Sequence, residues 1–184
     1  MQKVLQHSGL KLYQVEQLST HGGSLRVWAC LEQSTRQVDC SVSQMLQQEI
    51  DFGLATAEVY RGFQSEVDGV TAELKLFLQQ QQQAGLKVVA YGAAAKGNTL
   101  LNYAAVGADL LSVVFDAAPS KQGKYLPGSH IPIQSPEHFN QYAPDLVLIL
   151  PWNIKDEVVS YVKSIAAKPC AFVTAIPELI VIPA

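Results

Sequence analysis

Several features that mark common protein classes are scarce in this 184-residue sequence. Its 13 lysine and arginine residues are scattered, and the formal charge is -3, which argues against a nucleic-acid partner. No apolar run reaches the roughly 20 residues of a membrane-spanning helix. The N-terminus also lacks the apolar segment of a signal peptide. We therefore expect a cytoplasmic protein with no membrane partner.

Recognisable catalytic and metal-binding patterns are also missing. Three cysteines, Cys30, Cys40 and Cys170, form an odd set without metal-ligand spacing, which indicates free thiols in a reducing compartment. No Ser-His-Asp order or pair of carboxylates stands out, so the catalytic residues stay unassigned and no metal is expected. His21 lies beside a glycine pair, where a titrating group can approach a ligand, although a histidine in a surface loop is the simpler interpretation.

The apolar residues that are present, 48% of the chain, suffice for a buried core. In residues 1–40 they alternate with polar ones, which predicts a β-hairpin with strands Leu10–Leu18 and Ser24–Leu31. A two-stranded hairpin alone is only marginally stable in water. We therefore expect residues 1–40 to be the terminal piece of a larger domain whose beginning is missing. The exposed strand edges favour a homodimer.

Helical periodicity dominates residues 41–85. It predicts a short helix over Val42–Asp51 and a long helix from about residue 56 to residue 83, which Gly85 ends. One apolar stripe follows the long helix, so this segment is interpreted as a helical connector between neighbouring domains.

Strands and helices alternate over residues 86–184. Strands are expected at 86–91, 110–115, 130–133, 145–150 and 170–174, with helices near 96–106 and 154–167. This order predicts an α/β fold, a small Rossmann-like parallel sheet with flanking helices, preceded by the hairpin and the long connecting helix. Ligands in such sheets bind beyond the carboxyl ends of the strands.

The turn after the first of these strands is the leading candidate for a ligand site. Gly92 to Gly97 follow the pattern G-x-A-x-x-G, a dinucleotide fingerprint in which Ala94 replaces the middle glycine. A helix that begins here would present free backbone N–H groups to an anion. The alternative is a glycine turn retained only for helix–strand packing. Asp116, at the end of the second strand, occupies the place at which an acidic residue often meets ribose hydroxyls.

Several donor groups are expected at the same edge. Lysines in loops are usually solvated, Trp152 can be a core residue and Asn153 can cap the following helix, yet together they suit an anionic diphosphate with an attached ring. The candidate binding residues at this edge are Gly92, Ala93, Lys96, Gly97, Asn98, Thr99, Asp116, Lys121, Lys124, Trp152 and Asn153.

Four stretches carry a specific resemblance over nearly the whole chain. THGGSLRVWA, GAAAKGNTLLNYA, DAAPSKQGKYLPGSHIPI and DLVLILPWNIKDE are together similar to the C-terminal region of the S-adenosylmethionine-dependent C-methyltransferases that act on nucleotide-linked deoxy-keto sugars. The sequence lacks the zinc-binding cysteines, the glycine-rich methyl-donor loop and the catalytic motif that the family carries upstream. The resemblance thus implies an enzyme that also needs a missing N-terminal methyltransferase domain, and an inactive isolated fragment.

The resemblance also implies partners and roles. The diphosphate of the nucleotide sugar would bind at Gly92–Thr99 and the neighbouring loops, whereas His21 and Arg26 of the hairpin would face the sugar. S-adenosylmethionine would be the cofactor of the full-length protein, with no tight binding to this fragment. The alternative is a non-catalytic Rossmann module that binds NAD or coenzyme A, although Ala94 counts against NAD.

Overall fold

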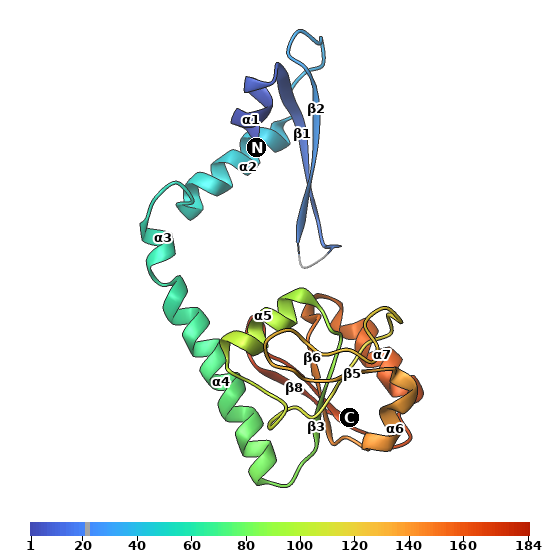
Figure 1. The fold of residues 1–184 in the computed structure, drawn as a ribbon. Coiled ribbons are helices and arrows are strands. Elements are labelled where there is room, and N and C mark those ends of the chain that lie inside the picture. The colour runs from blue at the N-terminus through green and yellow to red at the C-terminus, as the bar shows by residue number, and fades with distance from the viewer. Residues whose placement is uncertain (21–22) are drawn as a thin grey trace. The chain divides into compact units, whose positions relative to one another are not determined.

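The computed structural model describes residues 1–20 and 23–184. These residues form two compact units, Met1–Gln64 and Ser65–Ala184, each with a core of its own (Figure 1). The elements that begin in the first unit are α1 (Gln2–His7), β1 (Leu10–Leu18), β2 (Ser24–Leu31), α2 (Cys40–Phe52), α3 (Glu58–Arg61) and α4 (Phe63–Gln83).

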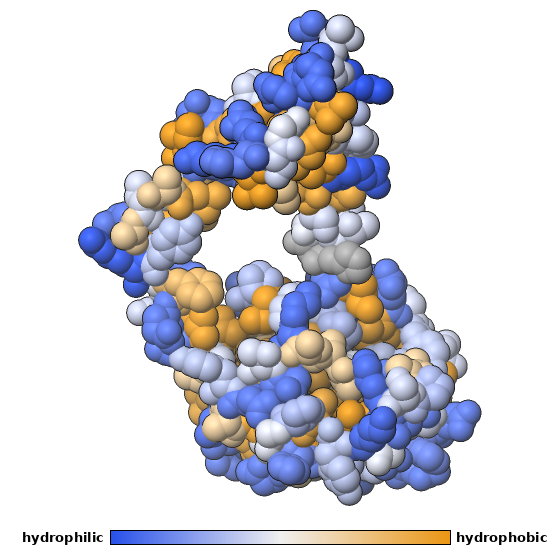
Figure 2. All heavy atoms as spheres, turned by 45° about the horizontal axis from the view of Figure 1, so that its top comes forward, coloured by the Kyte–Doolittle hydropathy of each residue, from blue (hydrophilic) through white to orange (hydrophobic). Residues whose placement is uncertain are grey.

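The predicted hairpin is confirmed, and both strands have the expected bounds. β1 and β2 pair antiparallel, and the inner face of β1 packs on α2 through Leu12, Val15 and Val42. The apolar residues of β2 stay largely exposed, with Leu25 at 52% and Leu31 at 58%. Apolar side chains are correspondingly visible on the surface of this unit (Figure 2).

The helix α2 is also as predicted, extended by a residue or two at each end. Asp39 caps its N-terminus, and the Asp39 carboxylate accepts the Ser41 N–H at 2.8 Å. The side chain of Ser41 and, after it, this N–H hold the pKa of Asp39 below its usual value. The Ser41 hydroxyl accepts the Val15 N–H at 3.1 Å, which ties the start of α2 to β1. The helix ends at Gly53, whose φ of 83° is the left-handed conformation of a C-terminal cap.

The long connecting helix is interrupted, unlike the continuous helix that its periodicity predicts. α3 ends at Arg61, Gly62 follows, and α4 begins at Phe63. Of the expected stripe, Phe63 is 64% exposed, whereas Leu74 is 0% exposed. Leu78, which was not part of the expected stripe, is also buried, with 1% of its surface exposed. The buried part of α4 therefore belongs to the core of the second unit.

The second unit is a six-stranded sheet of order β5-β4-β3-β6-β7-β8, with β8 antiparallel to its neighbour and all other pairs parallel. The Rossmann-like prediction is confirmed. Its remaining elements are β3 (Val88–Tyr91), α5 (Ala95–Tyr103), β4 (Val114–Phe115), β5 (Ile133–Gln134), η2 (Pro136–His138), α6 (Phe139–Tyr142), β6 (Leu146–Ile149), η3 (Trp152–Ile154), α7 (Lys155–Ile165), β7 (Ala171–Thr174) and β8 (Ile180–Ile182).

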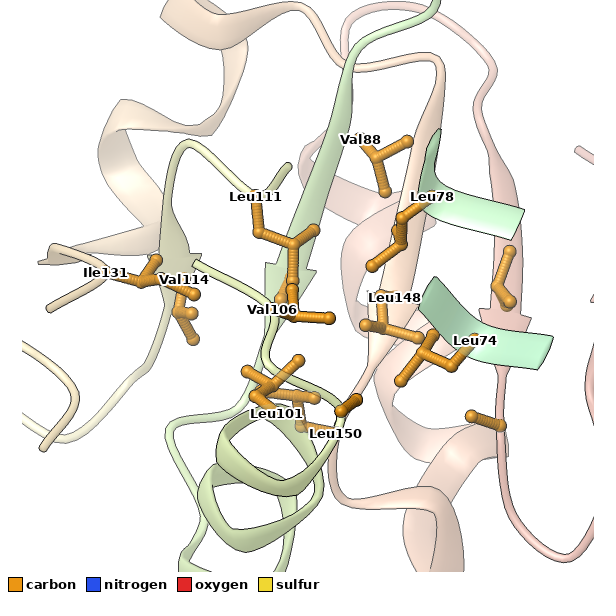
Figure 3. Close-up of a cluster of buried hydrophobic side chains, with 14 of the residues drawn as sticks. Leu74, Leu78, Val88, Leu101, Val106, Leu111, Val114, Ile131, Leu148 and Leu150 are labelled. Carbon is orange, nitrogen blue, oxygen red and sulfur yellow. The ribbon is translucent and has the colours of Figure 1, made fainter. Parts of the chain in front are cut away.

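Apolar side chains pack on both faces of this sheet. Alternate residues of the central strands point to opposite faces, so Val88 contacts one cluster and Val89 the other. α4 and α5 cover the first face, where Leu74, Leu78 and Leu101 pack against Leu148 (Figure 3). The second face is covered by α6 and α7, which contribute the buried residues Phe139, Val158 and Val162.

The strands of the second unit are shorter than the sequence predicts. The strand β8 in this unit and the helix α1 in the first unit are additional elements. Leu111 and Val113 are fully buried without belonging to a strand, so only Val114 and Phe115 of the expected strand 110–115 form β4. Within residues 1–20 and 23–184 no helix is long and apolar enough to cross a membrane. The same residues contain no group of three or more potential metal ligands.

Candidate functional site

The turn that follows β3 has a conformation only glycine adopts easily. Gly92 has a φ of 88°, and its N–H donates to the Phe115 carbonyl at 2.7 Å. A Cβ at this position would lie 2.5 Å from Pro151 Cδ, so the loops after β3 and β6 approach each other closely here. Gly92 therefore serves packing as well as turn geometry.

The first turn of α5 leaves its backbone donors free for a ligand. Ala94 is the N-cap residue and provides no side-chain cap, and the Asn98 N–H donates to the Ala94 carbonyl at 2.9 Å. The N–H groups of Ala95, Lys96 and Gly97 precede that bond and have no acceptor among the described residues. These N–H groups lie at the N-terminal end of α5, where the helix dipole is positive, so they favour the binding of an anion.

Asp116 fastens this turn to the loop after β4. The side chain is buried, with 7% of the residue exposed, and accepts the Ala93 N–H at 2.7 Å and the Ala118 N–H at 2.8 Å. Its third donor is the Lys121 ammonium, 2.9 Å away. Both carboxylate oxygens of Asp116 thus already accept hydrogen bonds. A ribose hydroxyl would have to donate a further hydrogen bond to one of them.

The loop 117–129, which contains the predicted lysines, is held in place at several points. Asn102 of α5 donates to the Pro127 carbonyl at 2.9 Å, and Gly128, with a φ of 84°, leaves no room for a Cβ beside the Asn102 side chain. Lys124 donates to the Ser120 carbonyl at 2.6 Å. The loop is therefore ordered by contacts within its own unit.

Two cavities flank the Gly92–Ala94 turn. The loop-side cavity, of about 540 Å³, includes Ala93, Asn98, Lys121 and Lys124, and its described lining contains no carboxylate. Within it, Asn98 contributes an amide whose Oδ1 atom is buried without a hydrogen-bond partner among the described residues. The α7-side cavity, of about 380 Å³, is lined by Tyr91, Gly92, Asp116, Lys121, Pro151, Ile154, Glu157, Val158 and Tyr161, together with Ala94 and Ala117.

A third group of predicted residues lies next to the cavities without lining them. The Lys96 ammonium is 4.9 Å from the centre of the Trp152 ring and donates to Asn153 Oδ1 at 3.1 Å. These contacts join the start of α5 to the loop after β6. The sequence correctly places these three side chains together at one edge, although their ammonium, ring and amide already interact with one another.

The remaining predicted residues have mainly local roles in the structure. Gly97 is buried, and a Cβ there would lie 2.5 Å from Leu150 Cβ, whereas the Thr99 hydroxyl donates to the Ala95 carbonyl at 3.2 Å. Arg26 lies in the first unit, where it pairs with Glu16 at 3.2 Å. His21 lies outside the described residues, so its proposed place near the sugar stays a prediction.

The tyrosines of the α7-side cavity were not among the predicted site residues. Tyr91 ends β3, and its ring centre is 5.8 Å from that of Tyr161 on α7. Burial, followed by the proximity of Tyr161 and Asp116, raises the pKa of Tyr91 to about 12. The apolar run 86–91 marked Tyr91 only as a strand residue. Its position directly before Gly92 is the signal that would have placed it at the ligand edge.

Known proteins match nearly the whole chain. The family described as the C-methyltransferase C-terminal domain matches residues 19–177. The chain is also 34% identical over 170 residues to C-methyltransferase NovU from Streptomyces niveus, an alignment that covers 92% of this chain and 40% of that protein. It therefore spans less than half the length of this curated relative. The resemblance seen in the sequence is confirmed: the chain belongs to the C-methyltransferase family, whose C-terminal domain its residues 19–177 match.

Proposed function

We propose that the chain is part of an S-adenosylmethionine-dependent C-methyltransferase that acts on a nucleotide-linked deoxy-keto sugar, and that its second unit binds the nucleotide diphosphate. The observation that carries this proposal is the loop-side cavity. Its described lining contains Lys124 and the Asp116-paired Lys121 but no carboxylate, and it includes Ala94 and Ala95 at the uncapped start of α5. Ammonium groups and free backbone N–H groups are the donors that a diphosphate requires.

In the proposed reaction a base removes the proton next to the sugar ketone, and the resulting enolate carbon takes the methyl group. S-adenosylmethionine supplies that methyl group, and we place its site on the methyltransferase domain that the longer relative suggests. This chain contributes binding and orientation. The second unit holds the diphosphate so that the sugar is fixed at one distance from the reacting centre, which lowers the entropic part of the barrier.

One feature of the turn concerns how any diphosphate would be held, and another favours a nucleotide sugar over NAD. Ala94 replaces the glycine that lets the backbone approach a pyrophosphate closely, so a diphosphate here needs side-chain donors as well as backbone ones. Asp116 already accepts hydrogen bonds from two backbone N–H groups and from Lys121, which reduces its capacity to bind both ribose hydroxyls. Coenzyme A remains the second candidate ligand to include in a binding test.

Calorimetric titration of the chain tests the proposal. We expect dTDP-glucose to bind, and NAD, coenzyme A and S-adenosylmethionine to bind at least tenfold more weakly. Lys124→Ala should raise the dissociation constant of dTDP-glucose about tenfold, because a hydrogen bond to a charged group contributes about 1.5 kcal/mol or more. Lys75→Ala, on α4, serves as the control for loss of one positive charge. Tight binding of the methyl donor or of NAD without binding of dTDP-glucose would overturn the assignment.

We also propose that the exposed apolar side of β2 contacts another protein surface, either the methyltransferase domain or a second copy of the chain. Leu25, Val27 and Leu31 keep between 37% and 58% of their surfaces exposed. Sedimentation equilibrium of the chain, with and without Leu31→Lys, distinguishes the two. A monomer at all concentrations would exclude the homodimer.

A further inference from the structure

The α7-side cavity lies where the topology of the sheet favours a ligand. In the sheet, β4 lies on one side of β3 and β6 lies on the other. After β3 the chain therefore builds one half of the sheet with β4 and β5, and then the other half with β6, β7 and β8. Open parallel sheets bind ligands at such a switch point, beyond the carboxyl ends of the strands. The cavity of about 380 Å³ is built from residues that follow β3, β4 and β6 and from one side of α7.

Charge distinguishes this cavity from the loop-side cavity. Its lining includes the carboxylates of Asp116 and Glu157 and a single ammonium, Lys121, which is already paired with Asp116. The loop-side cavity shares the paired Lys121, adds Lys124 and has no carboxylate among its described lining residues. Lys124 and the free N–H groups of α5 therefore favour phosphate groups on the loop side, whereas Asp116 and Glu157 oppose them on the α7 side, since like charges repel. The α7-side cavity suits a neutral group.

Its walls suit a flat ring with one polar edge. Pro151, Ile154 and Tyr161 provide apolar surface, and Ile154 and Tyr161 are 38% and 41% exposed, so both are accessible. Tyr91 is 9% exposed, and no described residue forms a hydrogen bond with its hydroxyl. The hydroxyl oxygen itself is not fully buried, so it is accessible from the cavity and can donate to a ligand or to water there. With its raised pKa, this hydroxyl keeps its proton and donates.

We propose that the α7-side cavity binds the nucleobase of the nucleotide sugar, with the Tyr91 hydroxyl donating to a carbonyl or ring nitrogen of the base and Tyr161 contacting its face. This inference rests on the proposed function and assigns a direction to the ligand. The base lies on the α7 side and the diphosphate on the loop side. Ala94 and Lys121, which line both cavities, mark the place where the ligand passes from one to the other.

Titration calorimetry with dTDP and with inorganic pyrophosphate separates the base from the phosphates. Tyr91→Phe removes only the hydroxyl, so the dissociation constant of dTDP should rise about three- to tenfold while that of pyrophosphate stays unchanged. Tyr161→Leu keeps an apolar helix residue and removes the ring, and it should also weaken dTDP selectively. Tyr142→Phe, outside both cavities, is the matched control and should change neither constant.

The melting temperature tests whether the Tyr91 hydroxyl has a purely structural role. If it had one, the melting temperature would fall in Tyr91→Phe. No bond within the described chain is lost in Tyr91→Phe, so its melting temperature should stay at or above that of the parent chain. Unchanged dTDP affinity in both variants would overturn the base assignment, as would equal weakening of dTDP and pyrophosphate. If the parent chain binds neither probe, the proposed function itself fails.

Discussion

Replacing Gly97 by alanine tests how closely α5 packs on the end of β6. A Cβ at residue 97 would lie 2.5 Å from Leu150 Cβ and 3.1 Å from its Cγ. Leu150 is fully buried, so it has no open space to move into. Overpacking of this kind typically costs about 1–3 kcal/mol, whereas the gain in helix propensity from glycine to alanine is only about 1 kcal/mol.

Gly69, within α4, provides the matched control. Nothing lies within 4 Å of a Cβ built there. Gly69→Ala should therefore raise the free energy of unfolding by roughly 0.5–1 kcal/mol, through helix propensity alone. Gly97→Ala should lower it by up to about 2 kcal/mol, which is the overpacking cost less the gain in helix propensity. The two variants should thus differ by about 1–3 kcal/mol, or by roughly 4–12 °C in melting temperature for a unit of this size.

Urea unfolding followed by tryptophan fluorescence gives both values. The chain has two tryptophans, so Trp28→Phe leaves Trp152 as the reporter of the second unit. Displacement of the first turn of α5 should also weaken dTDP-glucose binding in Gly97→Ala but not in Gly69→Ala. If both alanines stabilise the chain equally, the close approach of α5 to Leu150 is not a constraint, and the packing argument is refuted.

Three further substitutions test other parts of the second unit. Asn98→Leu removes a buried amide oxygen that has no hydrogen-bond partner among the described residues. The substitution should therefore raise the melting temperature while it weakens dTDP-glucose binding. A lower melting temperature would contradict this expectation. Asn102→Ala frees the Pro127 carbonyl and should speed proteolysis of the loop 117–129, measured by mass spectrometry, and an unchanged rate would show that the clamp is dispensable. The backbone N–H of Lys87 and, after it, the Lys168 side chain lower the pKa of Asp145. The ionised carboxylate therefore stabilises the fold above about pH 4, and this stabilisation is lost as the pH falls. Melting curves should show that acid lowers the melting temperature less in Asp145→Asn than in the parent chain.

Much of the fold follows from the periodicity of the sequence. Alternation located the hairpin, and the continuous apolar run at 146–150 located β6, because a strand buried on both faces has few polar positions. Periodicity reports burial rather than backbone pairing, however. Leu111 and Val113 are fully buried yet lie outside β4, so the apolar pattern predicted a strand longer than the one present.

The candidate site was only partly visible in the sequence. The segments after β3 and β6 gave Lys96, Trp152 and Asn153, which do meet, since these parallel strands are neighbours in the sheet and end at one edge. Distances across the turn were not accessible, because they depend on which side chains fill the space. No local sequence pattern predicts the close approach of Gly92 to Pro151 or the place of Tyr91 in the lining of the α7-side cavity.

The burial of Leu74 and Leu78 in α4 matters for exchanging this domain between relatives. A chimera joined at Gly85 would separate the sheet from the helix that covers one of its faces, and it would inherit an uncovered core. The helix break between Arg61 and Phe63 is the better junction, because Gly62 has no neighbour within 4 Å of a Cβ and few contacts would be rebuilt there. Recombination at this point transfers the sheet together with the helix surface that stabilises it.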